Sequence, residues 1–193
     1  MLAKVAIDTY FLDHLVTIQR HENIYDLICR FFQALGVSPN MHPLVYEKEI
    51  AFKQNAVSKK LFDNNLVCVP TFQEIWQGNA GGKRYYELMV AQIYNDFMGT
   101  AYPCADICAD WKAQMSLGEV HTVVMCAFLL WDCFLSDDGD AQKNLSGILN
   151  NRMTHPINIY SRGNRCDSLK GKVPEDRCGL TSKELKLLGH TRC

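Results

Sequence analysis

Two short apolar runs, each followed at once by carboxylates, restrict the fold of this chain more than any other feature of its sequence. The run 2–7 ends at Asp8, and the run 133–136 ends at Asp137-Asp-Gly-Asp140. Short apolar runs bounded by polar residues are typical of buried strands in a parallel sheet. Helical patterns lie between the two runs, so we expect an α/β fold with acids at the carboxyl ends of its strands.

Helical periodicity dominates the residues that follow the first predicted strand. From 11 to 35, apolar side chains recur mostly every three or four residues, and Gly36 stands where a C-cap is expected. Residues 37–41 are typical of a turn or a short linking strand. Pro43 then opens a helix predicted for about 44–57, because proline is favoured at the first helical position.

The middle of the chain predicts a helical insertion at about 57–116. Residues 64–70 fit either a short strand or a loop, and Thr71-Phe-Gln-Glu74 has the form of a capping box that starts a helix. A glycine-rich break at 78–82 separates this helix from a second one, predicted for 83–98. A last strand is expected at 158–160, after Pro156.

A strongly apolar predicted helix carries an acid on its buried side. Glu119, Val123, Cys126 and Leu130 recur at intervals of four, three and four residues and therefore share one helical face. An ionised carboxylate on such a face costs several kcal/mol unless it is paired, solvated or bound to a metal. Glu119 is for this reason a candidate functional residue.

The composition is that of an ordinary soluble domain and excludes several classes of protein. The chain has 193 residues, 48% of them hydrophobic and 21% charged, so one domain is the default expectation. Its nine cysteines do not fall into the pairs of a disulfide framework or a zinc ribbon, which favours a reducing, cytoplasmic location. The apolar amino-terminal run stops at Asp8, too short for a signal peptide or a membrane span, and we expect no membrane partner.

Basic charge is concentrated near the carboxyl terminus. The formal net charge is −1, to which residues 1–151 contribute −6 and residues 152–193 contribute +5. A net charge near zero argues against a general electrostatic binder of nucleic acid, although the basic tail itself would attract a phosphate backbone. A solvated appendage is the alternative for this tail. We expect residues 1–162 to form the α/β domain and residues 163–193 to form a basic C-terminal extension.

The acids and their order along the chain resemble the PIN-domain family of metal-dependent nucleases. Asp8-Thr9 after the first strand, Gly118-Glu119 at the start of the apolar helix, and Leu135-Ser-Asp-Asp-Gly-Asp140 after the next strand carry the resemblance. It covers roughly residues 1–55 and 116–162 and leaves the middle and the tail unmatched. The resemblance implies a PIN-like parallel sheet flanked by helices and an endoribonuclease that cuts single-stranded RNA.

The resemblance also implies which side chains carry out the chemistry. The catalytic acids of the family correspond here to Asp8, Glu49, Glu119, Asp138 and Asp140. All of these except Glu49 are the expected metal ligands. Glu47 is the alternative to Glu49, which lies four residues from Val45 and is therefore expected on the inward side of its helix. Thr9 and Asp137 are further candidates.

Clustered carboxylates suit a divalent cation on chemical grounds alone. Hydrolysis of a phosphodiester needs an activated water and stabilisation of charge on the phosphoryl oxygens, and a hard cation held by carboxylates supplies both. Acids that repel one another are tolerated where a cation neutralises them. We therefore expect Mg²⁺ or Mn²⁺ as the cofactor. Taken singly, the same acids also fit helix caps and a polar turn.

Basic residues away from the acids are candidate contacts for the substrate. Lys83 and Arg84 precede two tyrosines, and Arg162 and Arg165 lie at the start of the basic tail. The expected partner is RNA, and the resemblance adds an antitoxin protein and a second copy of the chain as candidates. Two other functions stay open: a PIN-like binding or scaffold module, and a metal-dependent phosphohydrolase acting on small molecules.

Overall fold

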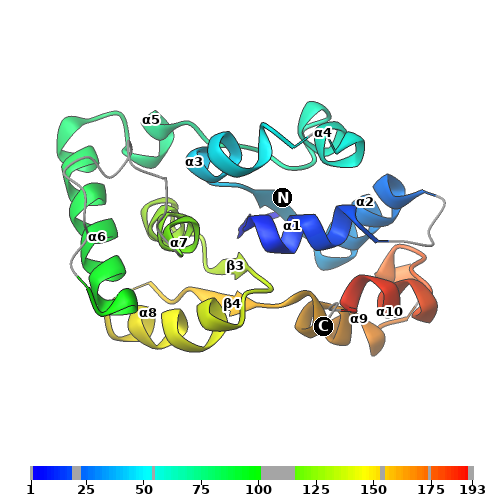
Figure 1. The fold of residues 1–193 in the computed structure, drawn as a ribbon. Coiled ribbons are helices and arrows are strands. Elements are labelled where there is room, and N and C mark those ends of the chain that lie inside the picture. Colours follow the sequence, from blue (N-terminus) through cyan, green and yellow to red (C-terminus); the bar gives the residue numbers. More distant parts are fainter. Residues whose placement is uncertain are drawn as a thin grey trace.

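A four-stranded parallel sheet forms the centre of the protein. The computed structural model describes residues 2–18, 23–53, 55–100, 116–152, 155–173 and 175–190. The strands are β1 (Ala3–Ile7), β2 (Val37–Asn40), β3 (Cys133–Leu135) and β4 (Asn158–Tyr160), and they lie in the order β2-β1-β3-β4 (Figure 1). The prediction of an α/β fold with a parallel sheet is confirmed, and residues 37–40 form a strand rather than a turn.

The carboxyl ends of the strands meet at one edge of the sheet. Ile7 pairs with Leu135, which in turn pairs with Tyr160, while Ala6 pairs with Asn40. The chain first adds β2 on one side of β1 and later adds β3 and β4 on the other side. The crevice at such a reversal of strand order is where open α/β sheets bind their ligands. Here the reversal lies between β1 and β3, the two strands that are followed by acids.

Helices cover both faces of the sheet (Figure 1). In chain order they are α1 (Thr9–Val16), α2 (Ile24–Leu35), α3 (Pro43–Val45), the π-helical turn η1 (Tyr46–Ile50), α4 (Ala56–Asp63), α5 (Phe72–Ile75), α6 (Ala80–Met98), α7 (Leu117–Leu129), the π-helical turn η2 (Ala141–Leu145), α8 (Ser146–Arg152), α9 (Arg162–Lys170), the 3₁₀ turn η3 (Glu175–Arg177) and α10 (Ser182–Gly189). Of the predicted insertion, residues 101–115 lie outside the described residues.

Alternation along the strands divides the core into two halves. Val5 and Ile7 of β1 pack into a cluster with α1, α2, α4, α9 and α10, whereas Ala6 packs into a second cluster with α6, α7 and α8. In β3, Leu135 belongs to the first cluster and Phe134 to the second. This alternation is required by a sheet that is buried on both faces, because successive side chains point to opposite faces.

Local signals in the sequence set several helix ends. Gly36 ends α2 with φ of 69°, a left-handed conformation that glycine adopts without steric cost. Thr71 and Glu74 form the capping box at the start of α5, and Thr181 and Glu184 form another at the start of α10. The predicted C-cap at Gly36 and the predicted capping box at Thr71 are confirmed.

The single helix predicted for about 44–57 is wrong. The helical backbone that begins at Pro43 ends at Ile50, and α4 begins only at Ala56. The side chain of Asn55 accepts hydrogen bonds from the backbone N–H groups of Val57 and Ser58, both at 3.0 Å. Asn55 is thus a new N-cap, and capping by a side chain stabilises a helix start at that point.

The tail is not a solvated appendage within the described residues. Leu169 of α9 and Leu185 and Leu188 of α10 are fully buried, and they pack in the same cluster as Leu27 and Phe31 of α2. The tail carries basic residues on its surface, but its apolar residues complete one half of the core. Among the described helices, none has both the length and the apolar character that a membrane crossing needs.

Candidate functional site

Asp8 lies at the carboxyl end of β1 and caps the helix that follows. Its Oδ1 accepts a hydrogen bond from the backbone N–H of Phe11 at 2.6 Å, so the capping role expected of an isolated acid is real. Only 4% of the residue is exposed. Its second oxygen, Oδ2, is buried and has no hydrogen-bond partner among the described residues. Oδ1 therefore caps α1, and Oδ2 remains available to a ligand.

Burial raises the pKa of the Asp8 carboxyl well above its usual value. The nearby Ser136 hydroxyl and the hydrogen bond from Phe11 act in the opposite direction, while the charges of Glu119 and Asp137 raise the pKa further. Charge on Asp8 is costly unless a cation is close, which is the electrostatic setting of a carboxylate that binds a metal ion.

Glu49 and Glu119 come to the same place from two other elements. Thr9 donates a hydrogen bond from its hydroxyl to the carboxylate of Glu49, which η1 presents to the start of α1. Glu119 lies in the first turn of α7. Glu47, the alternative to Glu49, is 61% exposed in its side chain and pairs with Lys48. Between the two, the structure brings Glu49 to Asp8 and Thr9.

The pKa values of these two glutamates are also raised. For Glu49 the main cause is burial, opposed by the Thr9 hydroxyl and the charge of Lys53. For Glu119 the main cause is again burial, and the charges of Asp138 and Glu49 raise its pKa further. Like charges that influence one another in this way are close in space, so the acids act as one electrostatic unit.

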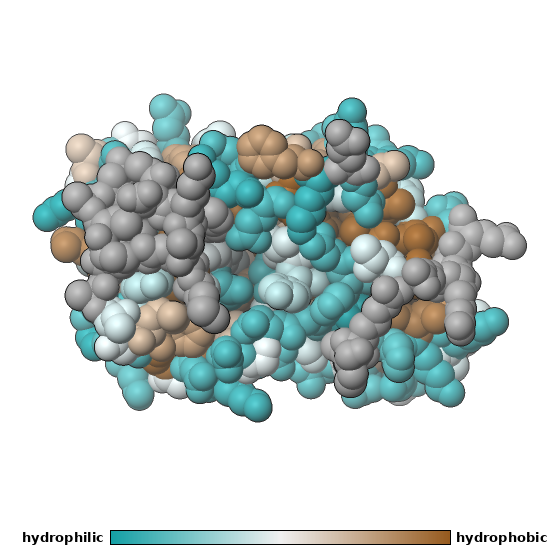
Figure 2. Space-filling view, in the orientation of Figure 1, coloured by the Kyte–Doolittle hydropathy of each residue, from teal (hydrophilic) through white to brown (hydrophobic). Residues whose placement is uncertain are grey.

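A small pocket collects these side chains. It has a volume of about 150 Å³ and is enclosed by the end of β1, the first turn of α1, the residues Val45 and Glu49, and the start of α7. Asp8, Thr9, Glu49 and Glu119 line it, and no Lys, Arg or His of the described residues does. Figure 1 shows α1 beginning beside α7, and hydrophilic side chains gather over the middle of this face in Figure 2. We call the pocket lined by these four residues the acid pocket.

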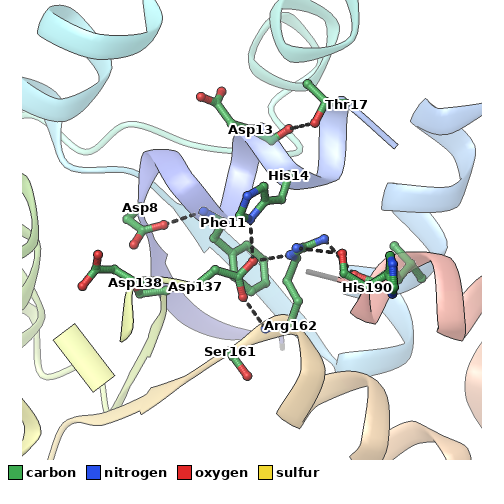
Figure 3. A network of polar contacts seen from close by, with 12 residues as sticks. Asp8, Phe11, Asp13, His14, Thr17, Asp137, Asp138, Ser161, Arg162 and His190 are labelled. Atoms are coloured by element: carbon green, nitrogen blue, oxygen red, sulfur yellow. Dashed lines mark hydrogen bonds and ion pairs between the residues drawn. The ribbon is translucent and has the colours of Figure 1, made fainter. Parts of the chain in front are cut away.

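The segment 137–140 contributes less directly than the resemblance implies. Asp138 accepts a hydrogen bond from the backbone N–H of Ala141 at 2.7 Å, so it caps the following helical turn. Its charge still raises the pKa of Glu119, and its carboxylate points away from Arg162 on the side where Asp8 lies (Figure 3). Asp140 is exposed and does not line the acid pocket. Asp138 remains a candidate ligand, whereas nothing in the fold directs Asp140 to the site.

Asp137 faces the opposite way. Its carboxylate is fully buried, pairs with the guanidinium of Arg162, and lies 3.0 Å from Nδ1 of His14 (Figure 3). It also accepts a hydrogen bond from the backbone N–H of Arg162 at 2.9 Å. The expectation of Asp137 as a site residue is therefore corrected: its charge is neutralised within the fold, at the junction of α1, β3 and α9.

The prediction that Arg162 binds substrate is not supported. Arg162 is 1% exposed, and besides Asp137 its guanidinium donates to the backbone carbonyls of Leu188 at 2.9 Å and His190 at 3.3 Å. A side chain with these partners has no free donor surface for a phosphate. Arg162 instead connects the end of α10 to the loop after β3. The charge pattern of the tail does not predict this structural role.

The other predicted basic contacts lie outside the acid pocket. Arg165 stacks on the ring of Tyr160, 3.8 Å from its centroid, and donates to Sγ of Cys133. Lys83 and Arg84 pair with Glu87 on the first turns of α6. Arg84 is 74% exposed in its side chain and available to a ligand. A role for these three residues in substrate binding stays a prediction.

No protein-family model, curated protein or solved structure matches the chain.

The acid pocket fits a divalent cation in its donor atoms but is not a finished metal site. No group of three or more His, Cys, Asp or Glu side chains within the described part of the chain is arranged to hold a metal ion. Asp8 nevertheless has a buried oxygen without a partner, and oxygen donors are those that Mg²⁺ and Mn²⁺ prefer. Mutual repulsion favours separation of such carboxylates until a cation draws them together.

Sequence reasoning missed one residue of the acid pocket. Tyr10 lines it and is 59% exposed, which is unusual for a large aromatic side chain. Its ring meets the His14 ring edge-on, with the centroids 6.1 Å apart, and this is its one ring contact among the described residues. The signal was present, since Tyr10 immediately follows Asp8-Thr9 and lies off the apolar face of α1. Exposed rings beside an acidic site are suited to stacking on a nucleobase.

A buried polar network behind the site was also missed. Tyr86 of α6 lies between His42, which follows β2, and His121 of α7, with its hydroxyl 2.8 Å from Nε2 of His42 and 2.6 Å from Nδ1 of His121. Nδ1 of His42 accepts from the backbone N–H of Leu44 at 3.1 Å, so a neutral His42 carries its proton on Nε2 and donates to Tyr86. The tyrosine hydroxyl then donates to His121. The network joins α6 to the two elements that carry Glu49 and Glu119.

This network predicts that acid destabilises the protein. Burial, aided by the charge of His121, holds the pKa of His42 well below its usual value, whereas the unfolded chain takes up the proton near pH 6.5. Below that pH the unfolded state binds more protons, so stability falls with pH by up to about 1.4 kcal/mol per unit for this group. We expect urea unfolding curves at pH 7.5, 6.5 and 5.5 to show this loss.

A variant isolates the contribution of His42. His42→Asn keeps an oxygen that can accept from Leu44 but has no titrating ring, so its stability should depend less steeply on pH below 6.5. The carboxyls whose pKa values are raised affect the pH dependence of stability in the opposite direction. They titrate in both proteins, so the comparison with the wild type cancels their contribution. Parallel pH dependences of the two proteins would contradict the assignment.

Proposed function

We propose that this protein is a metal-dependent ribonuclease that hydrolyses phosphodiester bonds of single-stranded RNA. The observation that carries the proposal is the convergence of Asp8, Glu49 and Glu119, from three elements distant in sequence, on one pocket whose described lining contains no basic side chain. Burial and mutual repulsion raise the pKa values of all three carboxyls. Such a cluster is stable in its charged form only with a cation.

The carboxylates nearest the pocket are the ones that would hold the ion. Asp8 would use its free Oδ2, Glu119 would approach from the first turn of α7, and Asp138 would approach from the end of β3. Mg²⁺ or Mn²⁺ bound there would lower the pKa of a bound water and offset negative charge on the phosphoryl oxygens. Glu49, held by the Thr9 hydroxyl, would orient a water by hydrogen bonding and accept its proton.

The sequence order and the fold together favour a nuclease of the PIN type over a small-molecule phosphohydrolase. The acids follow β1 and β3, at the reversal of strand order, and their order along the chain resembles that family. The preference for RNA over DNA comes from the resemblance. Tyr10 at the rim of the pocket offers a ring for a base next to the scissile phosphate, which a small phosphate ester would not use.

A cleavage assay with two matched variants tests the proposal. A 5′-labelled single-stranded RNA is incubated with the wild type and MnCl₂ or MgCl₂, or with EDTA. We expect cutting only with metal. Glu49→Gln should lower kcat/KM by about 100-fold or more, because it removes a proton acceptor, whereas Glu47→Gln, the same change on the exposed side of η1, should leave it unchanged.

The outcomes separate the proposed function from its alternatives. Equal loss in the two glutamate variants would remove Glu49 from the mechanism. No cutting of RNA together with no binding of Mn²⁺ by calorimetry would overturn the nuclease and favour a binding or scaffold module. Metal-dependent hydrolysis of small phosphate esters without cutting of RNA would favour the phosphohydrolase.

A further inference from the structure

A second pocket is lined by a neighbouring face of η1. It has a volume of about 500 Å³, within the usual range for small ligands, and is enclosed by η1, the turn after it, and α4. Tyr46 and Ile50 of η1 line it, while Glu49 of the same turn lines the acid pocket. The two pockets therefore share η1 as a wall. We call the second one the α4 pocket.

The polar side of the α4 pocket is suited to an anion. Lys53 and Lys59 bring two positive charges, and the amino terminus of the eight-residue helix α4 adds the positive end of its dipole. Asn55 already satisfies the N–H groups of Val57 and Ser58, so the donors for a ligand are the lysines rather than the backbone. Lys59 is exposed, whereas Lys53 pairs with Asp13 of α1 and would share its charge with the ligand. Asp63 is the acidic residue in the lining and lies at the far end of α4 from Lys53.

Ser58 gives independent evidence that the pocket receives a polar ligand. The residue is 4% exposed, lines the pocket, and its Oγ has no hydrogen-bond partner among the described residues. A buried hydroxyl without a partner costs stability, and such groups are few in native proteins. Ser58 lies in the first turn of α4 and lines the same pocket as Lys53 and Lys59, so its hydroxyl is a candidate donor to a phosphate oxygen.

The apolar side of the pocket is aromatic. The rings of Tyr46 and Phe62 lie against each other, with centroids 4.7 Å apart, and both residues line the pocket. Aromatic side chains beside positive charge are the usual means of holding a nucleotide of a single strand, because the base stacks while the phosphate binds the cation. A simple inorganic anion would leave this aromatic wall unused.

We propose that the α4 pocket binds one nucleotide of the RNA strand, beside the nucleotide whose phosphate occupies the acid pocket. The base would pack against Tyr46 and Phe62, and its phosphate would bind Lys53, Lys59 and the Ser58 hydroxyl. Lys53 lines the α4 pocket, and its charge also lowers the pKa of Glu49 in the acid pocket, so the two pockets are close. The proposal rests on the proposed function for the identity of the strand, but binding of a nucleotide here does not require cleavage.

Binding of 5′-AMP in EDTA tests the pocket without any cleavage. Calorimetry or a ligand-detected NMR titration should show 5′-AMP binding to the wild type, with adenosine and inorganic phosphate each binding more weakly. Lys59→Ala should weaken binding by about three- to fivefold and lower the slope of log affinity against log salt concentration by about one. Lys60→Ala, the same charge change on the same helix outside the pocket lining, should alter binding less than twofold.

Ser58→Ala gives a second readout that a merely structural serine would not give. Because its hydroxyl has no partner in the free protein, the variant should be at least as stable as the wild type in the absence of ligand, yet bind 5′-AMP more weakly. Equal binding by the wild type, Ser58→Ala and Lys59→Ala, or no binding of 5′-AMP at all, would overturn the proposal.

The cleavage assay distinguishes this failure from failure of the nuclease itself. We expect Lys59→Ala to raise KM for a single-stranded RNA of ten nucleotides by about three- to fivefold while kcat changes little. An unchanged KM in this variant, with RNA still cut, would overturn the proposed nucleotide site in the α4 pocket and leave the proposed nuclease activity standing. Loss of 5′-AMP binding in the variants, with no cutting of RNA by the wild type, would support a nucleotide site and overturn the nuclease.

Discussion

Asp8→Asn is expected to abolish metal-dependent cleavage of RNA while making the metal-free protein more stable. The variant keeps the oxygen that caps α1 through Phe11 and removes the charge that burial disfavours. Loss of one carboxylate ligand to a cation that stabilises the transition state by several kcal/mol corresponds to a loss of about 10³-fold in kcat/KM.

The stability of Asp8→Asn follows from the direction of the pKa shift. The unfolded chain loses the proton of Asp8 near pH 3.9, but the folded protein holds it to higher pH, so the folded state binds more protons and the wild type loses stability as pH rises through this window. At pH 7.5 in EDTA the variant should be more stable by about 1–3 kcal/mol. For a chain of this size that is an increase of about 2–4 °C in Tm per kcal/mol.

Thermal unfolding with and without Mn²⁺ checks both parts of this prediction. Mn²⁺ should raise the Tm of the wild type and leave that of Asp8→Asn unchanged, because ligand binding stabilises only a protein that binds it. Asp132→Asn is the matched control, since Asp132 is exposed just before β3, at the opposite edge of the sheet. A less stable Asp8→Asn, or an undiminished response to Mn²⁺, would remove Asp8 from the proposed metal site.

Arg162→Ala is expected to be the most destabilising of the substitutions considered. It leaves the buried carboxylate of Asp137 without its cation and the carbonyls of Leu188 and His190 without their donor. Breaking a buried ion pair by removing one partner costs about 3–5 kcal/mol. With a typical urea dependence of about 2 kcal/mol per M, the midpoint of unfolding should fall by about 1.5–2.5 M.

A double variant separates the loss of the pair from the loss of packing. Asp137→Asn combined with Arg162→Met removes both charges and keeps an oxygen at residue 137 for the backbone N–H of Arg162, so it should be more stable than Arg162→Ala. Arg165→Ala, one turn further along α9 and partly exposed, should cost about 1 kcal/mol or less. Stable Arg162→Ala with weakened RNA binding would instead restore the role in substrate binding predicted from the sequence.

The sequence determined the elements whose signals are local. The strand before Asp8, the break at Gly36 and the capping box at Thr71 are set by residues within a few positions of one another, and the structure has them where they were predicted. The α/β class follows from the same local patterns, because short apolar runs alternate with helical ones. The PIN-like identity and the nuclease activity remain proposals.

The roles of neighbouring acids were decided by tertiary structure. Asp137 and Asp138 are adjacent and chemically identical, yet one is neutralised by Arg162 while the other lies near Glu119. Successive side chains leave the chain in different directions, and which direction meets a cation depends on α9, twenty-five residues away. Likewise, Glu49 differs from Glu47 because Thr9 lies beside it. The sequence alone determined that acids follow the strands, and packing decided which of them remain unneutralised.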